Sequence, residues 1–239
     1  LRTMISQNFK KFNFSSIRTE TKKVNFIDDF EHNSITLING KLVSSNFEHE
    51  EESKISIRNF EIGDYSFSSE QNSLIHLNHA LSNQGYSLTV DDNYKAKKVL
   101  VIYNFFSSEL NENFLNIKNR IILGKNSELH IIELVINDSL KPFFCNIYED
   151  LKVGNSSTLK SIYLQNNKNF GYFHKFSENN INEKSNVSLI LFPSGPKFCK
   201  FDLKFNLLGK NSQCNFQAAT FLCEKDHHEI KTRVNHLFP

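Results

Sequence analysis

A strand–turn–strand unit that recurs between residues 117 and 239 constrains the fold more than any other feature of the sequence. The two clearest copies read IILGKNSELHII and LKVGNSSTLKSI, at residues 121–132 and 151–162. A looser copy covers residues 180–191, and a fourth covers residues 207–216. One serine aligns in every copy, with steps of 30, 28 and 27 residues between Ser127, Ser157, Ser185 and Ser212. Such a period is the signature of a stacked repeat.

The length of the repeat indicates which kind of stack it builds. Strands joined directly by hairpins would recur about every 8–12 residues, and no helical pattern separates the strands here. We therefore predict an all-β fold in which each copy is one coil of a parallel β-helix, a solenoid with two sheets. Equivalent side chains stack along the axis of such a coil. One interior ladder is expected to contain Leu129, Leu159, Val187 and Cys214.

The residues before the repeats predict a small α/β segment. Asn39-Gly40 lies between two alternating apolar runs and predicts a hairpin over residues 34–43. Apolar residues at helical spacing predict a helix over residues 73–83 that stops before Gly85. A short helix is also expected around residues 27–31. The acidic run at residues 48–52 is interpreted as a solvated loop.

Strand patterns begin at Tyr86. Residues 86–90 alternate between polar and apolar side chains, and residues 98–106 form an apolar, β-branched run that suits a strand buried on both faces. The chain is therefore divided into an N-terminal segment, residues 1–85, and a β-helix, residues 86–239. Because the sequence starts at Leu1 and stops just after a strand-like run without a polar cap, we expect a fragment truncated at both ends, with an incomplete β-helix.

The composition argues against several classes of protein. The 239 residues carry a net charge of +2, with 28 basic and 26 acidic side chains interspersed, so no basic field indicates a nucleic-acid partner. No run of about 18 apolar residues predicts a membrane span, and no secretory signal is visible. We therefore expect a cytoplasmic protein. The sequence lacks a P-loop and a Gly-x-Ser-x-Gly nucleophile elbow, and no catalytic residue is assigned.

The cysteines and the C-terminal polar cluster contain side chains that can ligate metals. Cys145, Cys199, Cys214 and Cys223 form no Cys-x-x-Cys pair and are interpreted as buried, reduced thiols. Residues 223–236 combine thiol, imidazole and carboxylate groups, which are types that iron accepts. The metal-ligand candidates in this run are Cys223, His227, Glu229 and His236. The preferred interpretation is an exposed turn and a structural polar ladder.

Several of these motifs occur together in one known family. The run INGKLV at residues 38–43 is followed by a helix, a strand pair and the Gly-Lys-Asn-Ser turns. Near the end, Thr232, Val234 and His236 match a Thr-x-Val-x-His pattern, although Lys231 stands where many members have His and Asn235 where many have Asp. In this order the motifs resemble the SufB/SufD family of iron–sulfur cluster assembly proteins, and the hairpin is more typical of its SufD branch.

The resemblance implies a right-handed parallel β-helix and a non-catalytic scaffold. Such a subunit pairs with a SufB-like subunit through the β-helix and is coupled to a SufC-like ATPase, in a hetero-oligomer. It implies that iron–sulfur cluster and ATP belong to the complex, with no cofactor bound by this chain. The family's functional Cys/His positions and SufC-docking helices would lie beyond Pro239, so none is assigned to a residue here.

Two other functions are compatible with a β-helix. A polysaccharide-active enzyme would need a carboxylate cluster with Arg or Lys in a groove on one sheet face. A purely structural β-solenoid would polymerise end to end through its open edges.

Overall fold

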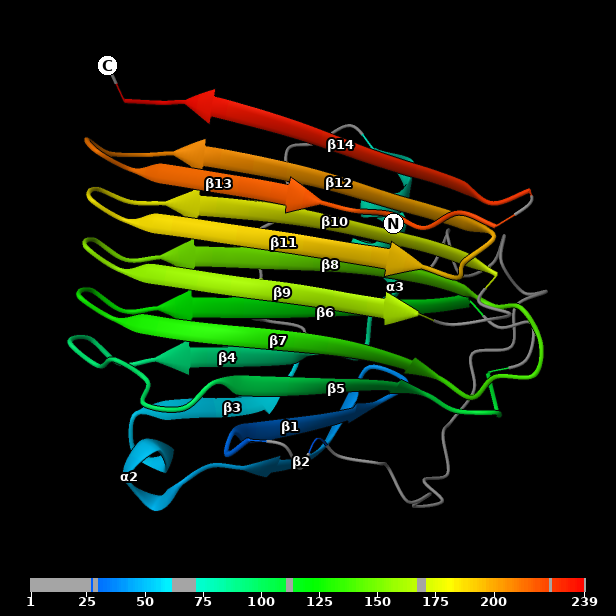
Figure 1. Cartoon of the computed structure of the whole chain (residues 1–239), viewed down its shortest axis with the longest axis horizontal. Helices are drawn as coiled ribbons and strands as arrows, with labels where there is room; N and C mark the ends of the chain where they lie inside the picture. Colours follow the sequence, from blue (N-terminus) through cyan, green and yellow to red (C-terminus); the bar gives the residue numbers. More distant parts are fainter. Residues whose placement is uncertain are drawn as a thin grey trace.

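The computed structural model describes residues 27, 30–61, 72–110, 114–166, 171–223 and 225–238. Two seven-stranded sheets stack face to face and form a parallel β-solenoid (Figure 1). The all-β, two-sheet solenoid predicted from the repeat is therefore confirmed. Sheet A consists of β13 (Gln213–Ala218), β11 (Asn186–Ser194), β9 (Thr158–Asn166), β7 (Glu128–Asn137), β5 (Leu100–Phe106), β1 (Asn33–Ile38) and β2 (Lys41–Asn46).

Sheet B has the same number of strands and is built from the alternate segments of the chain. Its order is β14 (His227–His236), β12 (Phe198–Leu207), β10 (Tyr172–Ile181), β8 (Phe144–Val153), β6 (Phe114–Leu123), β4 (Tyr86–Val90) and β3 (Ile55–Asn59). From β4 onward the chain alternates between the sheets, so each turn adds one parallel strand to each of them (Figure 1). Strands of one sheet are about 4.8 Å apart.

The N-terminal segment closes the first turn of the stack. The predicted hairpin is confirmed as β1 and β2, with Asn39 and Gly40 at φ 51° and 82° in its turn. β1 also pairs in parallel with β5, and β3 pairs antiparallel with β4, so the hairpin and β3 extend the same two sheets. A division of the chain at residue 85 stays a prediction.

Two helices lie among the described residues, α2 (His49–Glu52) and α3 (Ser73–Leu81). The predicted helix over residues 73–83 is confirmed as α3, which is capped by the Asn72 side chain. It packs against β6 and β8 on the outer face of sheet B, behind the stack in Figure 1. Ile27 and residues 30–31 are not helical, so the short helix expected there is wrong at these positions, while residues 28–29 lie outside the described residues.

An interior ladder of apolar side chains joins the turns. Strand register pairs Leu129 with Leu159, Leu159 with Val187, and Val187 with Cys214, so the predicted ladder is confirmed. The first three side chains are at most 2% exposed. Burying each contributes roughly 1.5–3 kcal/mol relative to leaving it in water.

The aligned serines form a second ladder, in the turns between the sheets. Ser157 Oγ accepts a hydrogen bond from the Ser127 N–H at 3.0 Å, and Ser185 Oγ accepts one from the Ser157 N–H at 3.2 Å. The Ser157 hydroxyl also donates to the Gly124 carbonyl at 2.6 Å. Ser127, Ser157 and Ser185 therefore connect neighbouring turns and satisfy backbone groups that are buried away from water.

The residue before each serine has a left-handed backbone. Asn126, Ser156, Lys184 and Asn211 have φ between 53° and 57°. This conformation reverses the chain sharply and is tolerated best by Gly and Asn. It accounts for Asn126 and Asn211, whereas Ser156 and Lys184 adopt it in the other two turns. Three of these residues also donate a backbone N–H to the next turn, to Asn155, Glu183 and Lys210.

The two edges of the solenoid differ in how much their connections vary. We call the side of the solenoid that carries the serine turns the near edge, and the opposite side the far edge. At the near edge, the four later turns occupy residues 124–127, 154–157, 182–185 and 208–212. At the far edge, the connections range from residues 195–197 to residues 219–226. The shortening of the repeat from 30 to 27 residues comes mainly from the far edge.

The serine ladder gives a prediction about stability. Ser157→Ala should lower the free energy of unfolding by about 1–3 kcal/mol, because the buried Ser127 N–H loses its acceptor. Ser212 makes one bond, to the Gly209 carbonyl at 2.7 Å, so Ser212→Ala should cost less than about 1 kcal/mol. Urea unfolding of the full chain measures both. If the two variants lost equal free energies of unfolding, the bonds between turns would add no stability beyond the bond within the turn.

Candidate functional site

The four predicted metal-ligand candidates lie in the last turn of the stack. Cys223 is exposed in the connection between β13 and β14, and its N–H donates to Asp226 at 3.0 Å. Glu229 accepts a hydrogen bond from Lys200 at 3.2 Å. His227 begins β14 and stacks on the Phe198 ring, with centroids 5.4 Å apart.

These residues are not gathered into one site. His227 and Glu229 share the outer face of β14, but His236 ends the same strand, nine residues and about 30 Å from His227. No three His, Cys, Asp or Glu side chains in the described ranges lie close enough to hold a metal ion together. Glu224 lies outside the described residues. A metal role for any of the four stays a prediction.

His228 has a structural role that the sequence did not predict. Its Nδ1 lies 2.6 Å from Thr220 Oγ1, and its Nε2 lies 3.1 Å from the Pro196 carbonyl oxygen. The ring therefore ties the connection after β13 to the connection after β11. This contact fixes the far edge of the solenoid at its last turn.

The last turn is open to solvent in the described part of the chain. The inward-facing Cys214, Phe216 and Ile230 are only partly buried, although their counterparts in earlier turns form the core. Exposed apolar side chains surround them, namely Phe221, Leu222, Val234, Leu237 and Phe238. Among the described residues, β13 and β14 are the terminal strands of sheets A and B.

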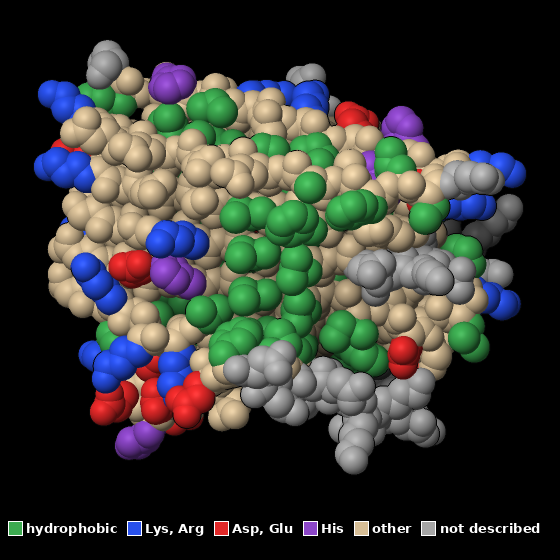
Figure 2. Space-filling view, viewed as in Figure 1, with side chains coloured by type: hydrophobic (Ala, Val, Ile, Leu, Met, Phe, Trp, Pro, Cys, Tyr) green, Lys and Arg blue, Asp and Glu red, His purple; other side chains and the backbone are tan. Residues whose placement is uncertain are grey.

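Sheet A carries an apolar column on its outer face. Strand register aligns Leu134, Leu164 and Phe192, and beside them Ile132, Ile162 and Ile190. Figure 2 shows hydrophobic side chains gathered over the middle of this face. A contiguous apolar surface of this kind is characteristic of a contact region for another protein segment.

The interior contains a charged cluster that the sequence reasoning missed. Lys175 is 6% exposed and forms ion pairs with Glu133 at 3.0 Å and Glu149 at 2.9 Å. Asn104 and Ser177 donate hydrogen bonds to the two carboxylates at 3.3 and 3.0 Å. Burial alone would lower the pKa of Lys175, but the two carboxylates outweigh it and raise the pKa, so the ammonium form persists.

Buried amide groups lie on both sheets of the same interior. In the described residues, Asn104 Oδ1, Asn119 Oδ1 and Gln165 Nε2 have no hydrogen-bond partner, and the three side chains are at most 2% exposed. Unsatisfied groups of this kind are places where water or another polar species can bind. The centre of the solenoid is therefore polar along part of its length.

The two interior cysteines have buried, weakly reactive thiols. Cys145 and Cys199 belong to one inward row, separated by Phe173, and both are at most 1% exposed. Burial raises the pKa of each thiol, so both remain protonated and weakly nucleophilic. The predicted buried thiols are confirmed for these two, whereas Cys223 is exposed and Cys214 is half-buried.

Comparison with known families decides the relationship of this chain. The family model of the SUF system FeS cluster assembly SufBD core domain matches residues 105–239, more than half of the chain. The chain belongs to the SufB/SufD family. No curated protein matches the chain. The match begins within β5 and contains every strand from β6 to β14, so the SufBD core coincides with the regular part of the solenoid.

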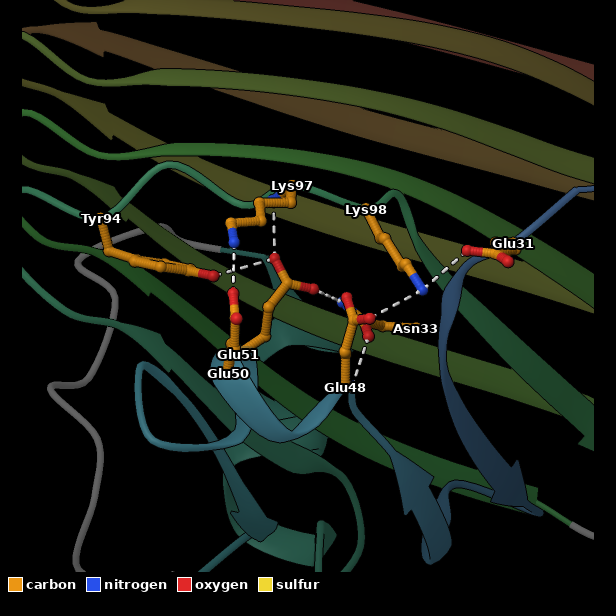
Figure 3. A network of polar contacts seen from close by, with 8 residues as sticks. All are labelled: Glu31, Asn33, Glu48, Glu50, Glu51, Tyr94, Lys97 and Lys98. Carbon is orange, nitrogen blue, oxygen red and sulfur yellow. Dashed lines mark hydrogen bonds and ion pairs between the residues drawn. The ribbon is translucent and has the colours of Figure 1, made fainter.

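A polar network closes the first turn, just before this SufBD core (Figure 3). Glu51 is fully buried, and its carboxylate accepts hydrogen bonds from Asn33, from the Tyr94 hydroxyl at 3.0 Å and from the Lys97 N–H at 2.6 Å. Burial raises its pKa, but these donors together lower it below the ordinary value. Burial and the Glu51 carboxylate raise the pKa of Tyr94 to about 12.

Ion pairs extend this network at the surface. Lys97 pairs with Glu50, and Lys98 pairs with Glu31 at 3.0 Å and with Glu48 at 3.3 Å. The solvated loop predicted for residues 48–52 is therefore wrong, because the run forms α2 and places one carboxylate in the interior. The network anchors α2 to the segment that leads into β5.

Helix α3 covers the outer face of sheet B in this SufBD-family fold. The Asn78 amide donates to the Ile117 and Asn146 carbonyls at 2.8 and 2.9 Å. His79 Nδ1 lies 2.8 Å from Lys118 Nζ. Burial, and then the nearby Lys118 charge, lower the pKa of His79 to about 4, while burial lowers the pKa of Lys118 to about 8. Helix α3 is thus joined to sheet B in part through His79 and Lys118, whose protonated forms are both disfavoured by burial.

The interior cluster gives a second prediction. Lys175→Met should lower the free energy of unfolding by about 3–5 kcal/mol, because it leaves Glu133 and Glu149 buried without a cation. Adding Glu133→Gln and Glu149→Gln should recover much of the loss, since no uncompensated charge remains. Chemical unfolding measures both variants. A triple variant no more stable than Lys175→Met would contradict the charge argument.

His79 gives a third prediction, on pH dependence. Its pKa is lowered in the folded state, so the unfolded chain binds more protons between pH 6.5 and about 4, and stability falls as the pH falls through this window. The contribution should be about 1–2 kcal/mol, reduced by partial exposure of the ring. The loss should be smaller in His79→Gln than in the wild type. His76→Gln, at an exposed position of the same helix, should keep most of it, because His76 is a smaller cause of the lowered His79 pKa than burial and Lys118 are.

Proposed function

We propose that this chain is a SufD-like scaffold subunit that supports iron–sulfur cluster assembly without catalysing a reaction itself. The observation that carries the proposal is the match of the SufBD core to residues 105–239, the regular part of the solenoid. The INGKLV hairpin, which forms β1, β2 and their turn, supports the SufD branch. The alternative within the family is a SufB-like subunit.

The partners follow from the scaffold role. A SufB-like subunit would pair with the β-helix, and a SufC-like ATPase would supply nucleotide-driven motion, so ATP and the iron–sulfur cluster would belong to the hetero-oligomer. The apolar column on the outer face of sheet A supports a contact with protein. A stack held by continuous strand pairing and a closed first turn can transmit motion as a rigid body.

The chemistry of the described residues supports a structural role for this chain. Cys145 and Cys199 are buried and protonated, and the interior carboxylates are engaged by Lys175. No helix in the described ranges has the length and apolar character needed to cross a membrane. The proposed location is the cytoplasm, where thiols stay reduced.

A polysaccharide-active β-helix enzyme is less well supported. Such an enzyme needs two carboxyl groups of different protonation flanking a substrate groove. On the outer face of sheet B the carboxylates are held by cations, Asp150 by Arg120 at 3.1 Å and Glu178 by Lys204 at 3.0 Å. Both carboxylates are thus engaged by neighbouring cations on the sheet surface and do not flank an open substrate groove as a free pair.

The proposal predicts a stable complex. When the full-length protein is co-expressed with the SufB-like and SufC-like subunits of its own organism, all three should co-elute in size-exclusion chromatography. Co-elution with a SufD-like subunit instead of a SufB-like one would place the chain in the SufB branch. A folded protein that retains neither subunit would contradict the scaffold role. Concentration-dependent filaments without partners would favour a structural solenoid.

A further inference from the structure

The charges inside the regular turns of the solenoid do not balance. Of the inward-facing side chains described in β5 to β12, three are charged, namely Glu133, Glu149 and Lys175. Lys175 Nζ lies 3.0 Å from Glu133 and 2.9 Å from Glu149, so two carboxylates share one ammonium group. A charge without a counter-ion is costly to hold away from water. One further positive charge would make this interior cluster neutral.

Amide oxygens without partners lie beside the two carboxylates. Asn119 is the neighbour of Glu149 in one inward row of sheet B, and the Asn104 amide donates to Glu133 at 3.3 Å. Within the described residues, Asn104 Oδ1 and Asn119 Oδ1 have no hydrogen-bond partner, and both side chains are 1% exposed. Each oxygen has two lone pairs that can accept. The region is therefore rich in acceptors that nothing in the described chain satisfies.

Accessible surface within the stack shows that side chains do not fill this region. Glu149 faces the interior from the middle of β8, yet 12% of its side chain is accessible. Ser161 faces the interior from β9, between Ile131 and Leu189, and is also only partly buried. Surface that a water-sized probe can reach between two packed sheets requires a hollow at least as large as that probe. The acceptors therefore have room for a small species beside them.

The donor atoms and the charge together favour a small cation in this hollow. Carboxylate, amide and hydroxyl oxygens are the ligands of hard cations, and carbonyl oxygens can replace the hydration shell of a monovalent ion. No three His, Cys, Asp or Glu side chains in the described ranges are placed to hold a metal ion, and a divalent ion would reverse the charge of the cluster. Burial, and then the Glu133 charge, raise the pKa of Tyr163, as expected in a negative field that would repel an anion.

We propose that this hollow binds one monovalent cation, with Glu149 and Asn119 as its principal oxygen donors. Ser161 and Asn104 can supply further oxygens from sheet A. The ion supplies the positive charge that Lys175 alone does not, and it joins neighbouring turns from the inside. Sodium, potassium and ammonium ions share the required chemistry. The inference goes beyond the scaffold role proposed above and does not depend on it.

Thermal unfolding of the full-length protein in chloride salts of equal ionic strength tests the proposal. Potassium, sodium and ammonium chloride are compared with N-methyl-D-glucamine chloride, whose bulky organic cation cannot be enclosed by a few oxygen atoms. At least one small cation should raise the Tm by about 3–6 °C, the rise that a tenfold excess over its dissociation constant gives for a chain of this size. The rise should saturate, and the most stabilising ion identifies the occupant. Equal Tm values in all four salts at every concentration would overturn the proposal.

Two variants of β8 locate the ion. Glu149→Gln leaves Lys175 paired with Glu133 alone, so its Tm should no longer distinguish the small cations from N-methyl-D-glucamine. Asp150→Asn removes the same charge from the next residue, on the outer face of sheet B, and should keep the wild-type response. Equal responses in the two variants would indicate a general salt effect and overturn the assignment. If Glu149→Gln fails to fold, wild-type crystals soaked in rubidium chloride decide: an anomalous peak beside Glu149 supports the site, and its absence overturns it.

Discussion

Parallel, in-register pairing places each side chain of this solenoid beside its counterparts one turn away, and the rest of the structure depends on that constraint. The side chains of one row must therefore be able to pack against each other from turn to turn. Phe114 stacks on Phe144 with centroids 4.6 Å apart, and a buried ladder joins Leu129 to Val187. A buried charge must find its opposite within reach. Lys175 does so across the interior, on Glu133 from the other sheet and on Glu149 one turn away.

The sequence allowed the repeated features to be predicted, because they carry the same residue types in each copy. The serine turns and the Leu129 ladder are examples. Features that occur once were missed. Lys175 occupies a row that is otherwise apolar, and its partner Glu133 lies 42 residues away, so no local pattern indicates the pair. Glu51 looked solvated because the donors that bury it come from other segments of the chain.

The C-terminal polar cluster shows where reasoning from composition fails. Residue types suited to iron are present, but His227 and His236 begin and end one extended strand and cannot converge. Their separation follows from strand geometry once the strand is known to run unbroken. The sequence alone did not establish this, since a break after Glu229 would have folded the two imidazoles together. To predict a set of metal ligands, the strand topology must therefore be known as well as the residue types.

The unequal edges of the solenoid have an evolutionary consequence. The four later near-edge turns are almost constant in length, because Ser127, Ser157 and Ser185 and the left-handed residues before them must meet the neighbouring turn. The far-edge connections range from residues 195–197 to residues 219–226 while the strand register is kept. From β6 onward, insertions can therefore accumulate along one edge alone. Within this fold, new loops, and the specificities they bring, would arise on that side, while the opposite edge would diverge by substitution only.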